Sequence, residues 1–167
     1  MLKRRKSKKS DRKYWIDQLD KVFSLYIRLR DSRPYRFASF RCISCGDVKP
    51  FEQMDAGHYI GRANMALRWD PSNVSGECRK CNRLDSSHLV FYRKNLIIKL
   101  GTDAIQSSAL AQSLDPDKRL TLIKRIGTQK VEALEARKYE MKKWSVEELQ
   151  QEYRYFAALV LELKNSM

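Results

Sequence analysis

Two Cys-x-x-Cys pairs are the residues most clearly suited to chemistry in this chain. Cys42 with Cys45 and Cys78 with Cys81 each enclose two residues, and 32 residues separate Cys45 from Cys78. Two intervening residues let one tight turn supply two ligands, so four thiolates can surround one Zn²⁺ tetrahedrally. Two disulfides are the alternative, which a reducing compartment disfavours. The spacing therefore predicts a structural zinc site with all four cysteines as ligands.

Polar residues between and beside these pairs predict a second, catalytic site. His58 is one of only two histidines, and its ordinary pKa lies near neutrality, which suits a general base in phosphodiester hydrolysis. Asn82 follows Cys81 directly, and its amide oxygen can ligate a catalytic Mg²⁺ or Mn²⁺; a helix N-cap is the alternative.

Asp55 is the carboxylate nearest to His58 and is predicted to be a ligand of the same catalytic metal. Strand alternation, however, puts Asp55 and His58 on opposite faces unless the strand bulges. The alternative is a structural carboxylate that orients a nearby group.

Two further residues are weaker candidates. Asn73 is predicted to hold the loop that positions His58 through backbone hydrogen bonds, with an ordinary Asp-Pro-Ser-Asn turn as the alternative. His88 can be a second metal ligand, a phosphate contact or an exposed loop residue, and the last is preferred.

The charge distribution predicts a polyanionic partner. The chain carries a formal charge of +14, of which +7 lies in residues 1–13 and +7 in residues 28–100. A basic tail beside a basic core favours binding to a phosphate backbone. The basic residues clustered around the site are predicted DNA contacts: Arg62, Arg68, Arg79, Lys80, Arg83, Arg93 and Lys94.

The hydrophobic patterns predict a mostly helical α+β fold around a small zinc-bound core. Residues 1–13 are expected to be a disordered tail, and residues 14–101 a zinc-stabilised core with an N-terminal helix. Apolar spacing predicts a helix over 11–30, strands near 40–46 and 54–60, and a helix opened by the second cysteine pair. That helix is expected to break near residues 86–87 and to stop at Gly101.

The remaining residues, 102–167, are predicted to form a helical region. Asp115 and Pro116 start a helix that Gly127 ends, Thr128 caps another, and Ser145 with Glu148 forms a capping box for a long helix over 145–165. The apolar spacing of this last helix suits packing on the first helix or a homodimer, and a homodimer is predicted because cutting two strands calls for two active sites.

The chain contains neither an apolar run of 18 residues nor a secretory signal, so a cytoplasmic protein without a membrane partner is expected.

The order strand, strand, helix, with histidine and asparagine at these positions, resembles the ββα-metal (HNH-type) nucleases. A longer series of landmarks resembles the phage lambda NinG (Rap) family of recombination endonucleases: Tyr14-Trp15-Ile16, Cys42–Gly46, Asp55–Tyr59, Leu67-Arg68-Trp69, Asn73, Cys78-x-x-Cys81-Asn82, Tyr92-Arg93 and Trp144-Ser145. The resemblance implies a metal-dependent endonuclease acting on Holliday junctions, D-loops and other branched DNA in a phage-infected or lysogenic host, with phage or host recombination proteins as partners.

The departures from that family include His88, which stands where asparagine is expected, and an insertion within residues 102–127. Two other functions stay open. One is a non-catalytic zinc-containing module that binds DNA or serves as a phage adaptor, and the other is an HNH nuclease with different DNA substrates.

Overall fold

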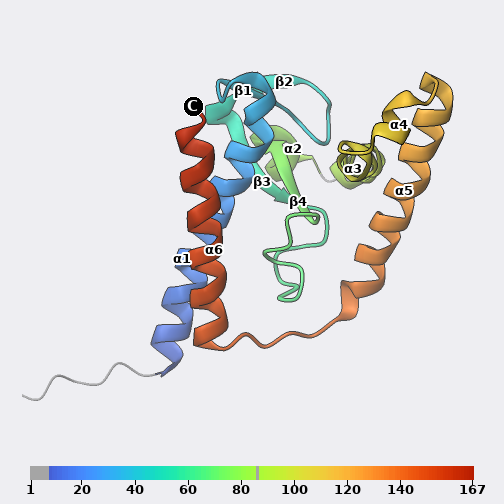
Figure 1. Ribbon diagram of the computed structural model, residues 1–167. Helices are drawn as coiled ribbons and strands as arrows, with labels where there is room; N and C mark the ends of the chain where they lie inside the picture. The colour runs from blue at the N-terminus through green and yellow to red at the C-terminus, as the bar shows by residue number, and fades with distance from the viewer. Residues whose placement is uncertain (1–7, 86) are drawn as a thin grey trace, which may run out of the picture.

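The computed structural model describes residues 8–85 and 87–167 and has a mostly helical α+β fold with two small antiparallel sheets (Figure 1). The strands are β1 (Ser39–Arg41) paired with β2 (Val48–Pro50), and β3 (Met54–His58) paired with β4 (Val74–Cys78). The helices are α1 (Lys8–Ser32), α2 (Arg79–Leu84), α3 (His88–Ile105), α4 (Ala109–Ser113), α5 (Pro116–Ala136) and α6 (Val146–Asn165), with short 3₁₀ helices η1 (Arg33–Tyr35), η2 (Phe51–Gln53) and η3 (Arg137–Tyr139). The predicted fold class is confirmed at this level.

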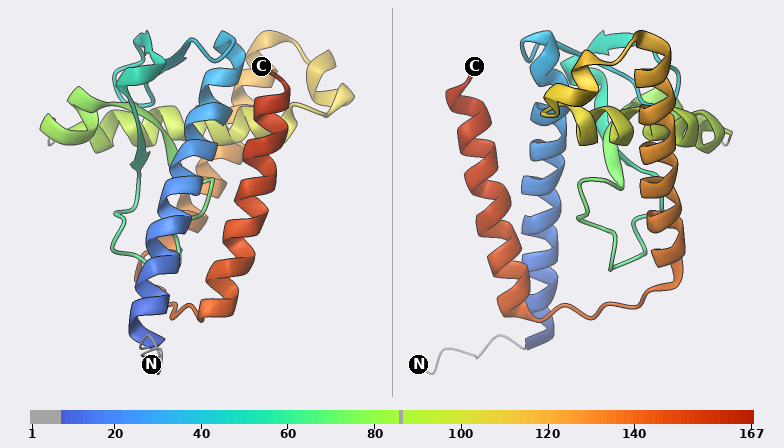
Figure 2. Two further views of the ribbon diagram at one scale, coloured as in Figure 1. Left: turned by 90° about the vertical axis from the view of Figure 1, so that its left-hand side faces the viewer. Right: turned by 45° about the vertical axis from the view of Figure 1, so that its right-hand side comes forward.

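Helices α1 and α6 lie side by side, although most of the chain separates them in sequence (Figures 1 and 2). The apolar face predicted for the first helix is buried, and Phe23 packs edge-to-face on Phe156 of α6 with ring centroids 4.8 Å apart. Leu149 and Val160 of α6 are buried in the same way. The apolar stripe of α6 therefore packs on α1 of the same chain, which is the alternative to packing on a second chain. The homodimer itself stays a prediction.

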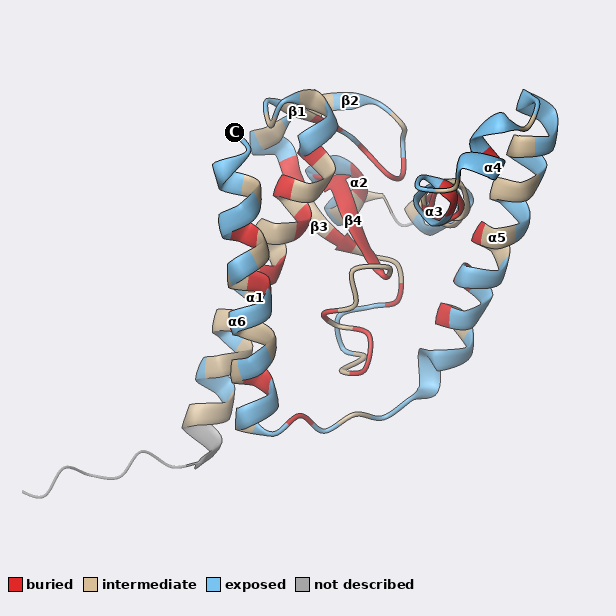
Figure 3. Cartoon of the chain, in the orientation of Figure 1, coloured by how far each residue is buried: buried red, intermediate tan, exposed pale blue. Residues whose placement is uncertain are grey.

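The β3–β4 hairpin lies between α1 on one face and α2 with α3 on the other. Its pairing runs without interruption from Met54 opposite Cys78 to His58 opposite Val74, and every residue of β4 is buried (Figure 3). Gly76 donates its backbone N–H to Asp31 of α1 at 2.6 Å, which fastens the first face to α1. Because side chains alternate along a strand, the opposite face carries Asp55, Gly57 and Glu77 toward α2 and α3.

Two glycines that were predicted to end helices instead lie inside helices, and both predictions are wrong. α3 continues through Gly101 to Ile105, and α5 continues through Gly127 to Ala136, so Thr128 caps nothing. A Cβ at Gly101 would lie 2.0 Å from the carbonyl oxygen of Ile123, and one at Gly127 would lie 1.8 Å from that of Ile97. Both glycines are there because α3 and α5 cross with their backbones in contact.

Most predicted helix ends are confirmed. Ser145 and Glu148 form the capping box of α6, Asp115 caps α5 with Pro116 in its first turn, and the break between α2 and α3 falls where it was expected. The tail prediction is wrong for its last residues, because α1 begins at Lys8; residues 1–7 lie outside the described residues. None of the helices in the described ranges has an apolar stretch long enough to span a bilayer.

Replacing Gly127 by alanine tests the close contact of α3 with α5. Helix propensity alone would make Gly127→Ala stabilising by about 1 kcal/mol, whereas the clash with Ile97 should lower the free energy of unfolding by about 1–3 kcal/mol. Urea unfolding followed by circular dichroism measures the difference. Gly61→Ala is the matched control, since a Cβ there meets no atom within 4 Å. Equal or greater stability of Gly127→Ala would contradict the crossing.

Candidate metal centre and active site

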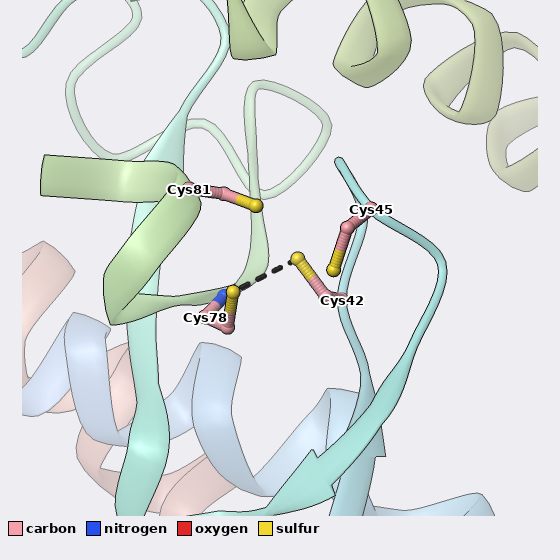
Figure 4. A group of neighbouring side chains, drawn as sticks. All are labelled: Cys42, Cys45, Cys78 and Cys81. Carbon is pink, nitrogen blue, oxygen red and sulfur yellow. Dashed lines mark hydrogen bonds between the residues drawn. The ribbon is translucent and has the colours of Figure 1, made fainter. Parts of the chain in front are cut away.

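The four cysteines come together from two turns. Cys42 and Cys45 lie in the turn after β1, where Gly46 has a positive φ of 77° and donates its N–H to the Cys42 carbonyl at 2.9 Å. Cys78 ends β4, and Cys81 lies in the first turn of α2. The four sulfur atoms lie within 4.8 Å of one another and point toward a common centre (Figure 4).

This arrangement can bind a metal ion such as zinc. Zn–S bonds of about 2.3 Å in a tetrahedron put sulfurs about 3.8 Å apart, which is compatible with four sulfurs that all lie within 4.8 Å of one another. All four cysteines are free thiols in the structure, so the alternative of two disulfides is not observed. Cys42, Cys78 and Cys81 are buried and Cys45 is exposed, which leaves one side of the centre open to solvent.

His58 ends β3 and faces a cavity of about 440 Å³. Its Nε2 lies 3.0 Å from the backbone carbonyl oxygen of Arg68. A carbonyl can only accept a hydrogen bond, so Nε2 carries the proton in the neutral ring and the lone pair is on Nδ1. Burial lowers the pKa of His58 below its ordinary value, and the positive charges of Arg62 and Arg68 act in the same direction. His58 is therefore arranged as a neutral Nδ1 base.

The cavity brings together residues from both sides of the hairpin. Asp20, Phe23 and Ser24 of α1 line one part of it, and Asn82 and His88 line another. Of the predicted catalytic residues, His58 and Asn82 share this cavity, whereas Asp55 and Asn73 do not line it. His88, which was preferred as an exposed loop residue, lines the cavity with its side chain only 16% exposed.

Asp55 holds Asn82 and Arg83 rather than facing His58. Its Oδ2 accepts from Asn82 Nδ2 at 3.0 Å and from Arg83 Nε at 2.7 Å, and its Oδ1 accepts from Arg83 Nη2 at 2.9 Å. Burial alone would raise the pKa of Asp55, but these hydrogen bonds outweigh burial and lower it. The strand has regular pairing, so Asp55 and His58 lie on opposite faces. This geometry is the one expected of the orienting alternative, and metal ligation by Asp55 stays a prediction.

Asn73 is fully buried and bonds the loop that follows His58. Its Oδ1 accepts from Ile60 N at 2.8 Å, and its Nδ2 donates to the carbonyls of Ile60 and Leu67 at 2.9 and 3.0 Å. Its own carbonyl accepts from Tyr59 N at 2.9 Å. These are the backbone hydrogen bonds expected of a residue that holds the loop in place.

The basic residues predicted to contact DNA divide into those that form ion pairs and those that do not. Arg62 and Arg68 both pair with Asp20, Arg93 pairs with Glu135, and Arg83 pairs with Asp55. Arg79, Lys80 and Lys94 are exposed and form no ion pair with another described residue. The three residues without an ion pair are the better placed to meet phosphates, whereas Arg68, with its side chain 16% exposed, mainly secures the loop.

Two acidic residues were missed from the sequence. Asp20 of α1 accepts hydrogen bonds from Arg62, Arg68 and the indole of Trp69, and so ties the loop of residues 61–73 to α1. Glu77 is fully buried beside Cys78. Nothing in the sequence singles out Asp20, because an acidic residue on the polar side of a helix is ordinary. Glu77 could have been noticed, because it is a charged residue inside a short strand.

Comparison with known sequences finds relatives of this chain. A profile of the family described as Bacteriophage Lambda NinG protein matches residues 1–118, which contain all four cysteines and every candidate residue of the cavity. The chain belongs to the NinG family. Relatives named Protein ninG occur in Escherichia phage 933W (39% identical), Escherichia phage lambda (38%) and Salmonella phage P22 (39%), each over 105 residues.

These alignments cover 62% of this chain and 48 to 49% of each NinG relative, so the chain spans about half the length of the curated relatives it matches. No solved structure gives a significant match.

Removing one thiol tests the metal centre. Protein purified from zinc-supplemented cultures should carry about one zinc per chain by mass spectrometry, and Cys78→Ser should lose most of it together with thermal stability, because three thiolates hold zinc less tightly than four. Glu52→Gln, an exposed change in η2 outside the cysteine turn, should keep the full content. A full equivalent of zinc in Cys78→Ser would show that the cluster is not the binding site.

Proposed function

We propose that this protein is a metal-dependent endonuclease that hydrolyses phosphodiester bonds in branched DNA, such as Holliday junctions and D-loops. The observation that carries the proposal is the placement of His58, a neutral base with Nδ1 available, in a cavity that it shares with Asn82, beside four clustered thiols. Two antiparallel strands followed by a helix carry these residues, which is the order of the ββα-metal nucleases.

His58 would take a proton from the attacking water through Nδ1 while Nε2–H stays bonded to the Arg68 carbonyl. That bond fixes the tautomer and the ring orientation. Asn73 and Asp20 act indirectly, because they hold the loop that carries the carbonyl.

Asn82 would contribute its amide oxygen to a catalytic Mg²⁺ or Mn²⁺, since its amide nitrogen is already engaged by Asp55. When bound, such a cation neutralises the charge that develops on the scissile phosphate. The four thiolates would hold a separate structural Zn²⁺, which fixes the backbone next to Asn82.

DNA would be held by the exposed cations near the site. Arg79 and Lys80 start α2 and Lys94 lies on α3, so phosphates can be met on the α2 and α3 side of the cavity. Cutting two strands of a symmetric junction calls for two active sites, so a homodimer on DNA is part of the proposal.

Substitution of His58 tests the proposal. Labelled four-way junction, D-loop and linear duplex are incubated with the protein and Mg²⁺, Mn²⁺ or EDTA. Wild type should cut branched DNA only with a divalent metal, and His58→Ala should cut about 10²–10⁴-fold more slowly while binding the same DNA equally well, because only the base is removed. Lys124→Ala, an exposed change on α5 away from the cavity, serves as the matched control. Binding of branched DNA without cleavage by wild type under any condition would favour the non-catalytic DNA-binding module.

The pH dependence of cleavage follows from the environment of His58. Because burial lowers the pKa of His58 below its ordinary value of about 6.5, the neutral base is populated already in mildly acidic solution. Single-turnover cleavage rates should therefore rise with pH and level off with an apparent pKa below 6.5. An acid limb centred above pH 7 would mean that a different group limits the rate.

A further inference from the structure

His88, the second histidine of the chain, is held by a buried carboxylate. Its Nδ1 lies 2.7 Å from Oε1 of Glu77, a residue with no exposed surface, and the hydroxyl of Ser44 donates to the same oxygen. Among the described residues, Oε2 of Glu77 has no hydrogen-bond partner although it is buried. A carboxylate in this position can only accept, so Nδ1 carries the proton and Nε2 of the neutral ring has the free lone pair.

The space for this carboxylate comes from Gly57. A Cβ at Gly57 would lie 2.2 Å from Oε2 and 2.8 Å from the Cβ of Glu77. Any other residue before His58 would therefore displace Glu77. The carboxylate of Glu77 on β4 thus fills the space that a side chain at position 57, next to His58, would take.

Asn82 is held in the same manner as His88. The Nδ2 of Asn82 donates to Asp55 at 3.0 Å, which leaves its Oδ1 free, and both Asn82 and His88 line the cavity that contains His58. Each residue has its N–H side fixed by a carboxylate and keeps a lone pair for another partner. A histidine that donates one ring N–H to a carboxylate is the usual arrangement of a metal-bound imidazole.

We propose that His88 is a ligand of the catalytic divalent cation through Nε2, together with Oδ1 of Asn82, and that Glu77 is the residue that positions His88. This inference rests on the proposed function for the role of the cation, but the site itself can be observed without DNA. Because Ser44 lies between Cys42 and Cys45 and donates to Glu77, the cysteine turn also supports the position of His88.

Electron paramagnetic resonance of Mn²⁺ tests the assignment. Untagged, zinc-loaded protein is titrated with Mn²⁺, and pulsed measurements record the coupling of the bound ion to ¹⁴N. With only two histidines in the chain, an imidazole signal comes from His58 or His88. Wild type should show the coupling, His88→Ala should lose it and bind Mn²⁺ at least tenfold more weakly, and His58→Ala should retain both.

Glu77 is tested through His88. Glu77→Gln keeps the size of the side chain but removes its charge, so Mn²⁺ binding should weaken about 10- to 100-fold with the ¹⁴N coupling still present, the range usual for the second partner of a metal-bound histidine. His88→Asn provides a second variant if alanine at this position unfolds the protein, and circular dichroism with zinc content reports the fold in each case.

Three results with the variants overturn the assignment. The first is unchanged Mn²⁺ affinity and ¹⁴N coupling in His88→Ala, and the second is loss of the coupling in His58→Ala instead. The third is weaker DNA binding by His88→Ala with Mn²⁺ binding intact, which would make His88 a phosphate contact. The proposed function fails separately, if wild type binds Mn²⁺ with the ¹⁴N coupling but cuts no DNA. If wild type cuts DNA but its bound Mn²⁺ shows no ¹⁴N coupling, the proposed function stands and His88 is not a ligand of the cation.

Discussion

The convergence of four thiols between two small sheets is the constraint on which the rest of the site depends. Each sheet has only two strands, and two-stranded sheets are barely stable in water by themselves. The cysteine cluster joins the turn after β1 to the end of β4, and the N–H of Cys78 donates to the sulfur of Cys42 at 3.3 Å. Since Asn82 follows Cys81 directly, the same cluster fixes where α2 begins and where the Asn82 amide stands.

A second support comes from α1, and it acts on the other side of the cavity. Asp20 gathers Arg62, Arg68 and the indole of Trp69, while Asn73 bonds the same loop from within. The loop matters because the carbonyl of Arg68 receives the Nε2–H of His58. The Arg68 guanidinium group binds Asp20 of α1, which holds the Arg68 carbonyl beside His58. Because that carbonyl accepts from Nε2, α1 helps to leave Nδ1 of His58 available.

Structural features that depend on residues close together in the sequence could be predicted. Features that depend on contact with a residue far away in the sequence could not. The cysteine turns, the capping box at Ser145 and the start of α5 follow from residues within a few positions of one another, and the structure has them. Gly101 and Gly127 carried the local signal of helix ends, yet each lies inside a helix and makes room for the backbone of another helix: Gly101 for α5 and Gly127 for α3. Local sequence cannot distinguish these two uses of glycine.

The candidate site shows the same division. His58 and Asn82 were found because histidine is rare in this chain and asparagine adjoins a cysteine. Glu77 and Asp20 were missed because burial and pairing across the fold give them their importance, and neither is visible in spacing. His88 was undervalued because its partner lies on a strand whose register was unknown.

The pairing of α1 with α6 has a consequence for how the molecule is made. The apolar side of α1 includes Leu19, Phe23 and Ile27, and Phe156 of α6 completes the cluster in which they are buried. During synthesis α1 leaves the ribosome long before α6, so part of this surface stays exposed to water while the cysteine turns, the hairpin and α5 are still being translated. Contacts between such distant segments form late and slowly. The newly made chain therefore passes through a period in which α1 is a target for chaperones or for other unfinished chains, and α6 ends that period.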